Sequence, residues 1–296
     1  MKEYFTGTDR FSEAHQLDGA MLSAYALRGR KSPPSVGRWM LDSGAFTQVT
    51  NYGDFIQSPE EYVRLAVRFQ DAGMLACIVS QDYMCEPSVI AELEAQGRKA
   101  SVRVHQRKSV DRYVQIVDEG IKQGLMVPVM PVLQGWEVED YVDHYHIYRR
   151  MLREIAHNRP WKDRYGNTIR SERGLWKHPF AKYPLVNRPW VGIGSTCKRN
   201  ANPEFVSQIL DAVIPLLPSN TKIHLFGFKK TGLAQANIKD RIYSADSFAY
   251  DFADRMAGKK RTSRRRIKSA RKFGYSIIHN NVQTNLDYDR STGSKS

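Results

Sequence analysis

The chain has 296 residues, of which 41% are hydrophobic and 26% are charged, as is ordinary for a soluble globular protein. This length supports one large α/β domain with a substantial core and excludes a minimal module. No apolar run reaches the 18 residues that a membrane-spanning helix needs, and residues 1–10 lack the apolar core of a signal peptide. Because Cys77, Cys85 and Cys197 are too few for a disulfide framework, we expect a cytoplasmic protein.

The unusual number is the net charge of +14, and it is concentrated in two segments. Residues 259–272 carry nine basic and no acidic residues, and residues 149–188 carry eleven basic and three acidic ones. The other 242 residues sum to −3. This distribution predicts an anionic partner such as nucleic acid, although a charge run is also the ordinary exposed face of a helix.

Short, almost continuously apolar runs alternate with helical patterns along the chain. The runs are Tyr4–Phe5, Trp39–Leu41, Leu75–Val79, Val127–Leu133, Trp190–Ile193, Ile223–Phe226, Ile242–Tyr243 and, more weakly, Tyr275–Ile278. Such runs indicate strands that are buried on both faces. Helices are predicted from the capping box at Ser58, over Val110–Gln123 and Val138–His157, and from Pro203 to Leu210.

Strand–helix alternation over nearly 300 residues predicts an α/β fold, and six to eight such units favour a (β/α)8 TIM-like barrel over an open sheet. We assign residues 1–258 to this barrel, with residues 158–189 as a basic insertion rich in Pro, Gly, Arg and aromatic residues. Residues 259–287 are interpreted as a basic, nucleic-acid-binding extension. Residues 288–296 are expected to be a disordered tail.

Polar residues follow several of the apolar runs, where the carboxyl ends of parallel strands meet at one rim. They include Asp42, Ser43, Asp82, Gln134 and Asp246. An Asp after a strand often only caps the next helix, and a Gly there often only makes a turn. Three carboxylates at the same structural level are instead typical of a working site, because like charges repel.

Two carboxylates that flank a sugar suit chemistry at an anomeric carbon, where one attacks and the other moves a proton. Glycines let a flat ligand approach the backbone closely. Aromatic side chains at the rim, Phe46 and Phe226, suit stacking on a base.

At these positions the sequence resembles the tRNA-guanine transglycosylase superfamily. The segments that carry the resemblance are Leu41-Asp42-Ser43-Gly44-Ala45-Phe46, Asp82-Tyr83-Met84-Cys85-Glu86-Pro87, Val132-Leu133-Gln134-Gly135, Val191-Gly192-Ile193-Gly194, His224-Leu225-Phe226-Gly227 and Ala245-Asp246-Ser247. They occur in the family's order from about residue 38 to residue 250. The resemblance implies a barrel enzyme that exchanges guanine in a nucleic acid for a 7-deazaguanine base, without a cofactor.

Carried over by position, the resemblance implies that Asp246 is the nucleophile at C1′ and that Asp42 is the general acid and base. Asp82 and Gln134 would hydrogen-bond the base edge, with backbone help near Gly192 and Gly194. Phe46 and Phe226 would stack on the base, beside Ser43.

Two departures point to one branch of the superfamily. The tRNA enzymes carry a zinc site of three cysteines and a histidine after the nucleophile, but no cysteine follows Cys197 here, so neither a metal nor a zinc subdomain is expected. Ser195 stands where the bacterial tRNA enzymes have Glu. The pattern looks most like the DpdA-type DNA-guanine transglycosylases of bacteria and bacteriophages, which implies double-stranded DNA with a flipped guanine as partner and, for a phage protein, the host cytoplasm.

In this interpretation the basic run after the nucleophile binds DNA, through Lys259, Lys260, Arg261, Arg264, Arg265, Arg266, Lys268, Arg271 and Lys272. The alternatives are a tRNA-directed transglycosylase, a non-catalytic nucleic-acid-binding barrel, and an unrelated barrel hydrolase or metal enzyme that uses His144 and His146. His144 and His146 are two positions apart in a predicted helix and would point to different faces.

Overall fold

The computed structural model describes residues 1–163, 165–170, 189–197, 202–228, 230–248 and 262–279. Its strands are β1 (Glu3–Gly7), β2 (Ala20–Ser23), β3 (Arg38–Asp42), β4 (Met74–Val79), β5 (Val129–Met130), β6 (Val132–Leu133), β7 (Trp190–Ile193), β8 (Lys222–Leu225) and β9 (Ser244–Ser247). Its helices are α1 (Ala24–Leu27), α2 (Ala45–Tyr52), α3 (Pro59–Phe69), α4 (Pro87–Ala95), α5 (Val102–Gln123), α6 (Val138–Asn158), α8 (Pro203–Val213), α9 (Lys230–Leu233), α10 (Ala236–Lys239) and α12 (Ser263–His279). Within these residues, 3-10 turns cover Ala14–Gln16 and Ile214–Leu216.

The strands form one parallel sheet in the order β5-β4-β3-β2-β1-β9-β8-β7-β6. Its two ends meet in a single stretch of chain, because β5 and β6 are separated only by Pro131. On one side of this stretch, the Ser80 amide donates to the Met130 carbonyl over 2.9 Å. On the other side, the Gly192 amide donates to the Pro131 carbonyl over 2.8 Å. Residues 129–133 therefore act as one strand that closes an eight-stranded barrel, as predicted for a TIM-like fold.

The alternation of side chains along the strands divides the core into two layers. Phe5, Met40 and Trp190 pack together in a cluster inside the barrel. Their neighbours Tyr4, Trp39 and Val191 belong to the larger cluster between the strands and the helices. By the same alternation, residues 42, 224 and 246 face the barrel interior, and this places their polar groups at its carboxyl-terminal mouth.

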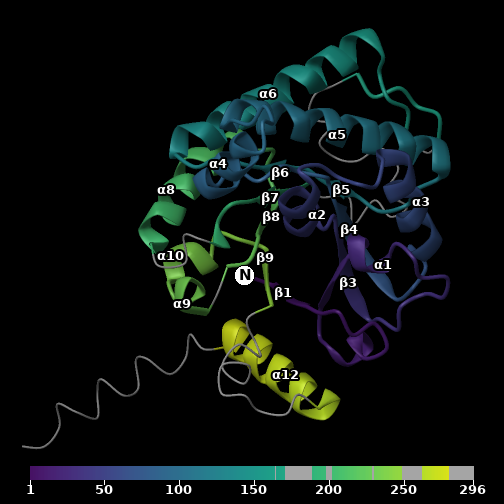
Figure 1. Ribbon diagram of the computed structural model, residues 1–296, viewed down its shortest axis with the longest axis vertical. Helices are drawn as coiled ribbons and strands as arrows, with labels where there is room; N and C mark the ends of the chain where they lie inside the picture. Colours follow the sequence, from purple (N-terminus) through teal and green to yellow (C-terminus); the bar gives the residue numbers. More distant parts are fainter. Residues whose placement is uncertain (164, 171–188, 198–201, 229, 249–261, 280–296) are drawn as a thin grey trace, which may run out of the picture.

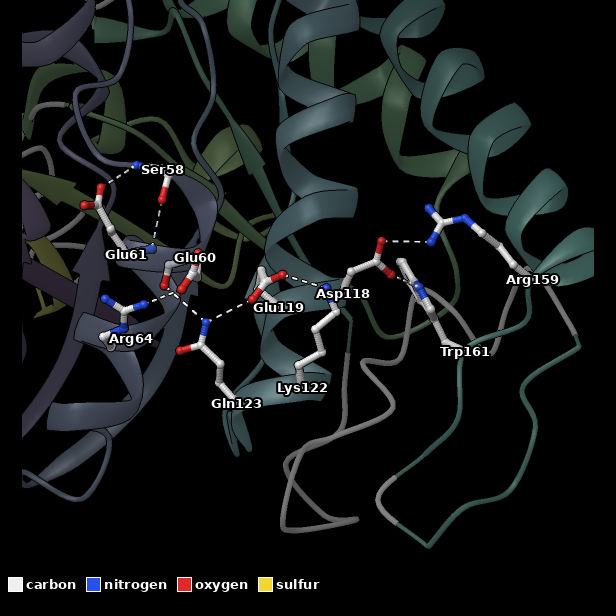
Figure 2. Close-up of polar contacts among 10 residues, drawn as sticks. All are labelled: Ser58, Glu60, Glu61, Arg64, Asp118, Glu119, Lys122, Gln123, Arg159 and Trp161. Carbon is white, nitrogen blue, oxygen red and sulfur yellow. Dashed lines mark hydrogen bonds and ion pairs between the residues drawn. The ribbon is translucent and has the colours of Figure 1, made fainter.

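The helices surround the sheet, as Figure 1 shows. The capping box predicted at Ser58 opens α3, where the Ser58 hydroxyl accepts from the Glu61 amide and the Glu61 carboxylate accepts from the Ser58 amide. Figure 2 shows how polar side chains continue from α3 to α5 and to the chain after α6. Gln123 donates to the Glu60 carbonyl, and Arg159 and Trp161 both donate to Asp118.

The structure corrects four sequence expectations. The apolar run Ile242–Tyr243 precedes the last strand, which is the more polar stretch Ser244–Ser247. Tyr275–Ile278 belongs to α12 rather than to a strand. The short strand β2 was not predicted, because Ala20–Ser23 has a single large apolar pair. Helix α5 begins at Val102 with Ser101 as its cap, eight residues before the predicted start at Val110.

The C-terminal basic run is largely one face of α12, which packs beside β1 (Figure 1). Ala270 and Ile277 are 2% and 3% exposed, and the Phe273 ring lies 6.0 Å from that of Tyr4. Residues 263–279 thus occupy the place of the helix that follows the last strand in a TIM-like barrel. Among the described residues, no helix is both long and apolar enough to cross a membrane.

Candidate active site

Three carboxylates meet at the mouth of the barrel, as the sequence predicted. Asp42 ends β3, Asp246 lies within β9, and Asp82 comes three residues after β4. Asp246 raises the pKa of Asp42, and Asp42 raises the pKa of Asp82. The three groups therefore interact electrostatically, although they come from distant parts of the chain.

Asp42 is the last residue of β3 and directly precedes the tight turn that leads into α2. Its Oδ2 atom accepts a hydrogen bond of 3.0 Å from the Gly44 amide, and Gly44 has a φ of +76°, which favours glycine. Burial and the nearby Asp246 charge raise the pKa of Asp42 to about 7, against the opposing effect of the backbone amides. At neutral pH this carboxyl is therefore poised both to give and to take a proton.

Asp82 is buried and held by the side chain of Gln134. Gln134 Nε2 donates to Asp82 Oδ2 over 2.5 Å, and Gln134 Oε1 accepts from the Ser195 hydroxyl over 2.7 Å. The serine thereby fixes which end of the amide points to the carboxylate. Burial raises the pKa of Asp82 to about 7, the hydrogen bond from Gln134 opposes this, and the Asp42 charge adds to it. The arrangement presents a carboxyl and an amide edge side by side.

His144, one of the two histidines considered as metal ligands, instead supports this pair from below. The Gln134 backbone amide donates to His144 Nδ1 over 2.8 Å, and the buried imidazole stacks on Tyr148. Burial lowers the pKa of His144 to about 3, so the ring is neutral and accepts at Nδ1. Within the described ranges, no group of three His, Cys, Asp or Glu side chains has an arrangement that suits a metal ion.

Asp246 is held through one of its two oxygens. Oδ1 accepts from the Gly227 amide over 2.9 Å and lies 3.2 Å from His224 Nε2. The other ring nitrogen of His224 lies 2.9 Å from the Ser244 hydroxyl, and the imidazole is fully buried. Among the described residues, nothing hydrogen-bonds Oδ2 of Asp246. The arrangement fixes the carboxylate and keeps one oxygen available to a ligand.

His224 is a site residue that the sequence reasoning did not single out. It was quoted only as the first residue of a motif, since a histidine inside an apolar strand is ordinarily a packing residue. The register supplies the missing signal, because residues 224 and 246 both point into the barrel on adjacent paired strands.

Gly192 and Gly194 leave room for two of the predicted site residues. A Cβ atom at Gly192 would lie 2.4 Å from the Phe226 ring, and one at Gly194 would lie 2.1 Å from Gln134 Nε2. The absence of a side chain at these two glycines therefore lets Phe226 and Gln134 pack directly against the backbone at the end of β7.

The remaining predicted ligand contacts lie at different depths. Phe46, in the first turn of α2, is 61% exposed, whereas Phe226 is partly buried and meets the His224 ring edge-on at 4.5 Å. Ser43 is fully buried between Asp42 and α2, and its carbonyl accepts from Gln48.

The predicted basic residues divide into three groups. Arg264, Arg265, Lys268, Arg271 and Lys272 lie exposed along α12. Arg266 differs, because it is 8% exposed and pairs with Asp9 over 3.0 Å, just beyond the carboxyl end of β1. This contact places the start of α12 near the rim. Lys259, Lys260 and Arg261 lie outside the described residues.

The earlier basic segment does not adjoin the rim where the structure describes it. Helix α6 begins after Gln134 at the mouth and runs back along the barrel, so its end at Asn158 lies toward the amino ends of the strands. Arg159 and Trp161 bind Asp118, near the end of α5, at 2.8 and 2.7 Å. Residues 149–163 therefore lie away from the mouth, so this basic segment does not flank the candidate site there, and residues 171–188 lie outside the described residues.

A known protein family matches half of the barrel. Residues 22–155 match the DpdA family, DeoxyPurine in DNA protein A. The DpdA match covers just under half of the chain and includes Asp42, Asp82 and Gln134, but it ends before β7. Over this stretch it confirms the resemblance to DpdA-type transglycosylases, and it indicates a DNA-modifying transglycosylase. No curated protein matches the chain.

Proposed function

We propose that the protein exchanges guanine in DNA for a 7-deazaguanine base through a covalent Asp246–deoxyribose intermediate. The observation that carries this proposal is the presence of Asp42 and Asp246 together at the carboxyl-terminal mouth of the barrel. Asp42 lies inside the DpdA match and Asp246 lies outside it, yet their charges interact at one barrel mouth. Two carboxyl groups on one ligand site, one fixed and one near neutral pKa, suit the two roles that a retaining exchange requires.

In the first step, Oδ2 of Asp246 attacks C1′ of the target nucleotide while the bond from C1′ to N9 of guanine breaks. The hydrogen bonds from Gly227 and His224 to Oδ1 orient the carboxylate. Asp42 enters this step protonated and gives its proton to the departing guanine. A pKa of about 7 supplies both the acid form for this step and the base form for the next.

In the second step, a 7-deazaguanine occupies the vacated pocket, gives its N9 proton to Asp42, and attacks C1′ to release Asp246. Two inversions give net retention. The Asp82 carboxylate suits the N–H donors of a guanine-like edge, and the second amide hydrogen of Gln134 suits its carbonyl oxygen. The target guanine has to leave the helix for this geometry, at a cost of a few kcal/mol.

The test is the Asp246→Asn variant, assayed for incorporation of labelled base into duplex DNA. We expect the rate to fall by about 10³-fold or more while DNA binding is retained, because only the nucleophile is removed. Trapping of a covalent DNA complex by the wild type, and its absence in the variant, is the second readout. Incorporation at the wild-type rate would refute the assignment of Asp246.

A tRNA-directed exchange is the second candidate, because the superfamily motifs at the rim are common to both branches. Parallel assays with duplex DNA and with tRNA separate the two. Incorporation into tRNA alone would replace DNA as the substrate without changing the roles of the carboxylates.

A further inference from the structure

A second basic feature lies on the outer side of the barrel and begins next to its mouth, at a place that the charge distribution along the sequence did not reveal. It is a surface pocket of about 300 Å³ between α1 and α3. Its lining residues are Arg28, Ile56, Gln57, Glu61, Arg64, Leu65 and Arg68. We name it the arginine pocket, and its volume lies at the small end of ordinary ligand sites.

The floor of the arginine pocket is buried and its walls are charged. Leu65 and Gln57 are 3% and 7% exposed, whereas Arg28, Arg64 and Arg68 are exposed side chains. The lining contains one carboxylate, Glu61, which already accepts the Ser58 amide in the capping box. Three guanidinium groups against one carboxylate leave a net charge of +2 on the pocket.

Two of these arginines are held by neutral groups rather than by acids. The Arg28 guanidinium lies 3.8 Å from the centre of the Tyr25 ring and donates to the Tyr25 carbonyl. Arg68 donates to the Arg30 carbonyl over 3.3 Å. In the part of the chain that the structure describes, neither has a carboxylate within 4.0 Å. Only Arg64 has one, through its pair with Glu60 on the exposed face of α3. The positive charge of Arg28 and Arg68 is thus positioned but not neutralised.

The location ties the arginine pocket to the catalytic mouth. The Gln57 carbonyl accepts from the side chain of Gln81, the residue before Asp82. Tyr25, which carries Arg28, lies against Gly44, where a Cβ atom would come within 2.9 Å of the tyrosine Cβ. The end of the pocket formed by Arg28 and Gln57 therefore lies next to the segments that carry Asp42 and Asp82, and Arg68 forms its far end, in the last turn of α3.

We propose that the arginine pocket binds the phosphodiester backbone of the DNA strand next to the extruded guanine. Planar guanidinium groups bind phosphate oxygens in pairs, and arginines preset by a ring and by carbonyls lose little freedom on binding. Ile56, which is 47% exposed at the pocket edge, provides an apolar surface for the sugar. This inference rests on the proposed function, since it takes DNA to be the substrate.

The test compares two double variants that each remove two positive charges. Arg28→Gln with Arg68→Gln alters the pocket, and Arg150→Gln with Arg153→Gln alters exposed positions in the second half of α6, away from the mouth. Binding of a fluorescent DNA duplex is measured by anisotropy over a series of NaCl concentrations, with thermal melting of each variant as a check on folding.

We expect the pocket variant to bind DNA about 10- to 100-fold more weakly at low salt. Its slope of log K against log [salt] should be shallower by about 1.8, because each phosphate that the variant no longer neutralises reduces the slope by about 0.9. The α6 variant should keep the wild-type affinity and slope. Equal weakening of DNA binding in both variants overturns the inference, because the effect then comes from the total charge of the protein. Unchanged binding by the pocket variant overturns it as well, because the pocket then does not contact DNA.

Failure of the proposed function gives a different result. A wild type that binds DNA and exchanges base, together with an unaffected pocket variant, overturns the pocket alone. A wild type that binds no DNA at low salt overturns both. Normal base exchange by Asp246→Asn overturns the nucleophile and leaves the pocket to be judged by its own binding data.

Discussion

At the scale of single residues, His224 distinguishes this site from an ordinary carboxylate pair. Its ring nitrogens lie 3.2 Å from Asp246 Oδ1 and 2.9 Å from the Ser244 hydroxyl, so it positions the side chain that we propose as the nucleophile. Replacement by Phe keeps the ring and its contacts with Phe5 and Phe226 but removes the donor.

We therefore expect His224→Phe to lower kcat for base exchange by about 10- to 100-fold, with little change in KM for the free base, because one oriented hydrogen bond is removed. His224→Gln, which restores a donor, should recover part of the rate. The two variants are compared in single-turnover experiments alongside their melting temperatures. A rate decrease that follows melting temperature rather than the presence of a donor would contradict the positioning role.

The raised pKa values of Asp42 and Asp82 predict how stability depends on pH. The pKa of each carboxyl is about 3.8 in the unfolded chain and about 7 in the folded protein. Between these values the native state holds protons that the unfolded state has released. Their stabilising contribution is complete below pH 4 and is lost as the pH rises through 7.

Removal of one of these charges should therefore stabilise the protein only at high pH. Asp82→Asn can still accept from Gln134, and its free energy of unfolding should be roughly 1–3 kcal/mol higher than that of wild type at pH 8 and near that of wild type at pH 4. Urea unfolding at the two pH values measures this. A difference that is the same at both would mean that the Asp82 proton is not involved.

At the scale of elements, α12 has one buried face and one exposed basic face. Its buried face, with Ala270 and Ile277, completes the helical layer, while Lys268 and Arg271 on the other face meet solvent. Changes on the two faces should separate cleanly. Ala270→Glu buries an unpaired charge and should destabilise the fold by several kcal/mol, seen as a lower melting temperature.

The exposed face makes the opposite prediction. Replacing Arg264, Arg265 and Lys268 together by Gln should leave the melting temperature nearly unchanged and make the salt dependence of DNA binding shallower by up to about 2.7. If the triple variant binds like wild type over the whole salt series, the basic run is only a solvated helix face.

Local patterns in the sequence predicted some elements well and others poorly. Continuous apolar runs identified the central strands, and the Ser58 capping box and Pro203 marked two helix starts, because these signals are local. The strand that carries Asp246 has the sequence Ser-Ala-Asp-Ser. Its polar residues remove the continuous apolar pattern by which the other buried strands were predicted. In the sequence, Arg266 is one more basic residue in a run. Only its ion pair with the distant Asp9 shows that it has a structural role.

At the scale of the whole molecule, the residues at the mouth were easier to predict than the side chains that hold them in place. Because parallel strands end together, the sequence predicted that one mouth would contain Asp42, Asp82, Gln134 and Asp246. The roles of Ser195 and His224 depend on side chains from other strands, and the arginine pocket depends on the packing of α1 against α3. None of these leaves a pattern along the chain.

The DpdA match covers a half-barrel rather than a structural unit, since residues 22–155 contain β3–β6 and the last two residues of β2. Expressed alone, this segment would expose the β2 edge that pairs with β1 and the β6 edge that pairs with β7. We expect it to lack a cooperative urea transition, while the full chain unfolds in one step. A sharp transition of the fragment with a full-length midpoint would show that the half-barrel folds independently.

The pairing of β1 with β9 has a consequence for synthesis on the ribosome. Glu3 and Thr6 align with Ser244 and Ser247, so the first strand to emerge waits for the last before both of its edges are satisfied. Until about 240 further residues have been made, the nascent chain carries an open strand edge that contains Tyr4 and Phe5. Asp246, the proposed nucleophile, lies on the strand that closes this edge, so assembly of the candidate active site and removal of the aggregation-prone edge occur in a single late event.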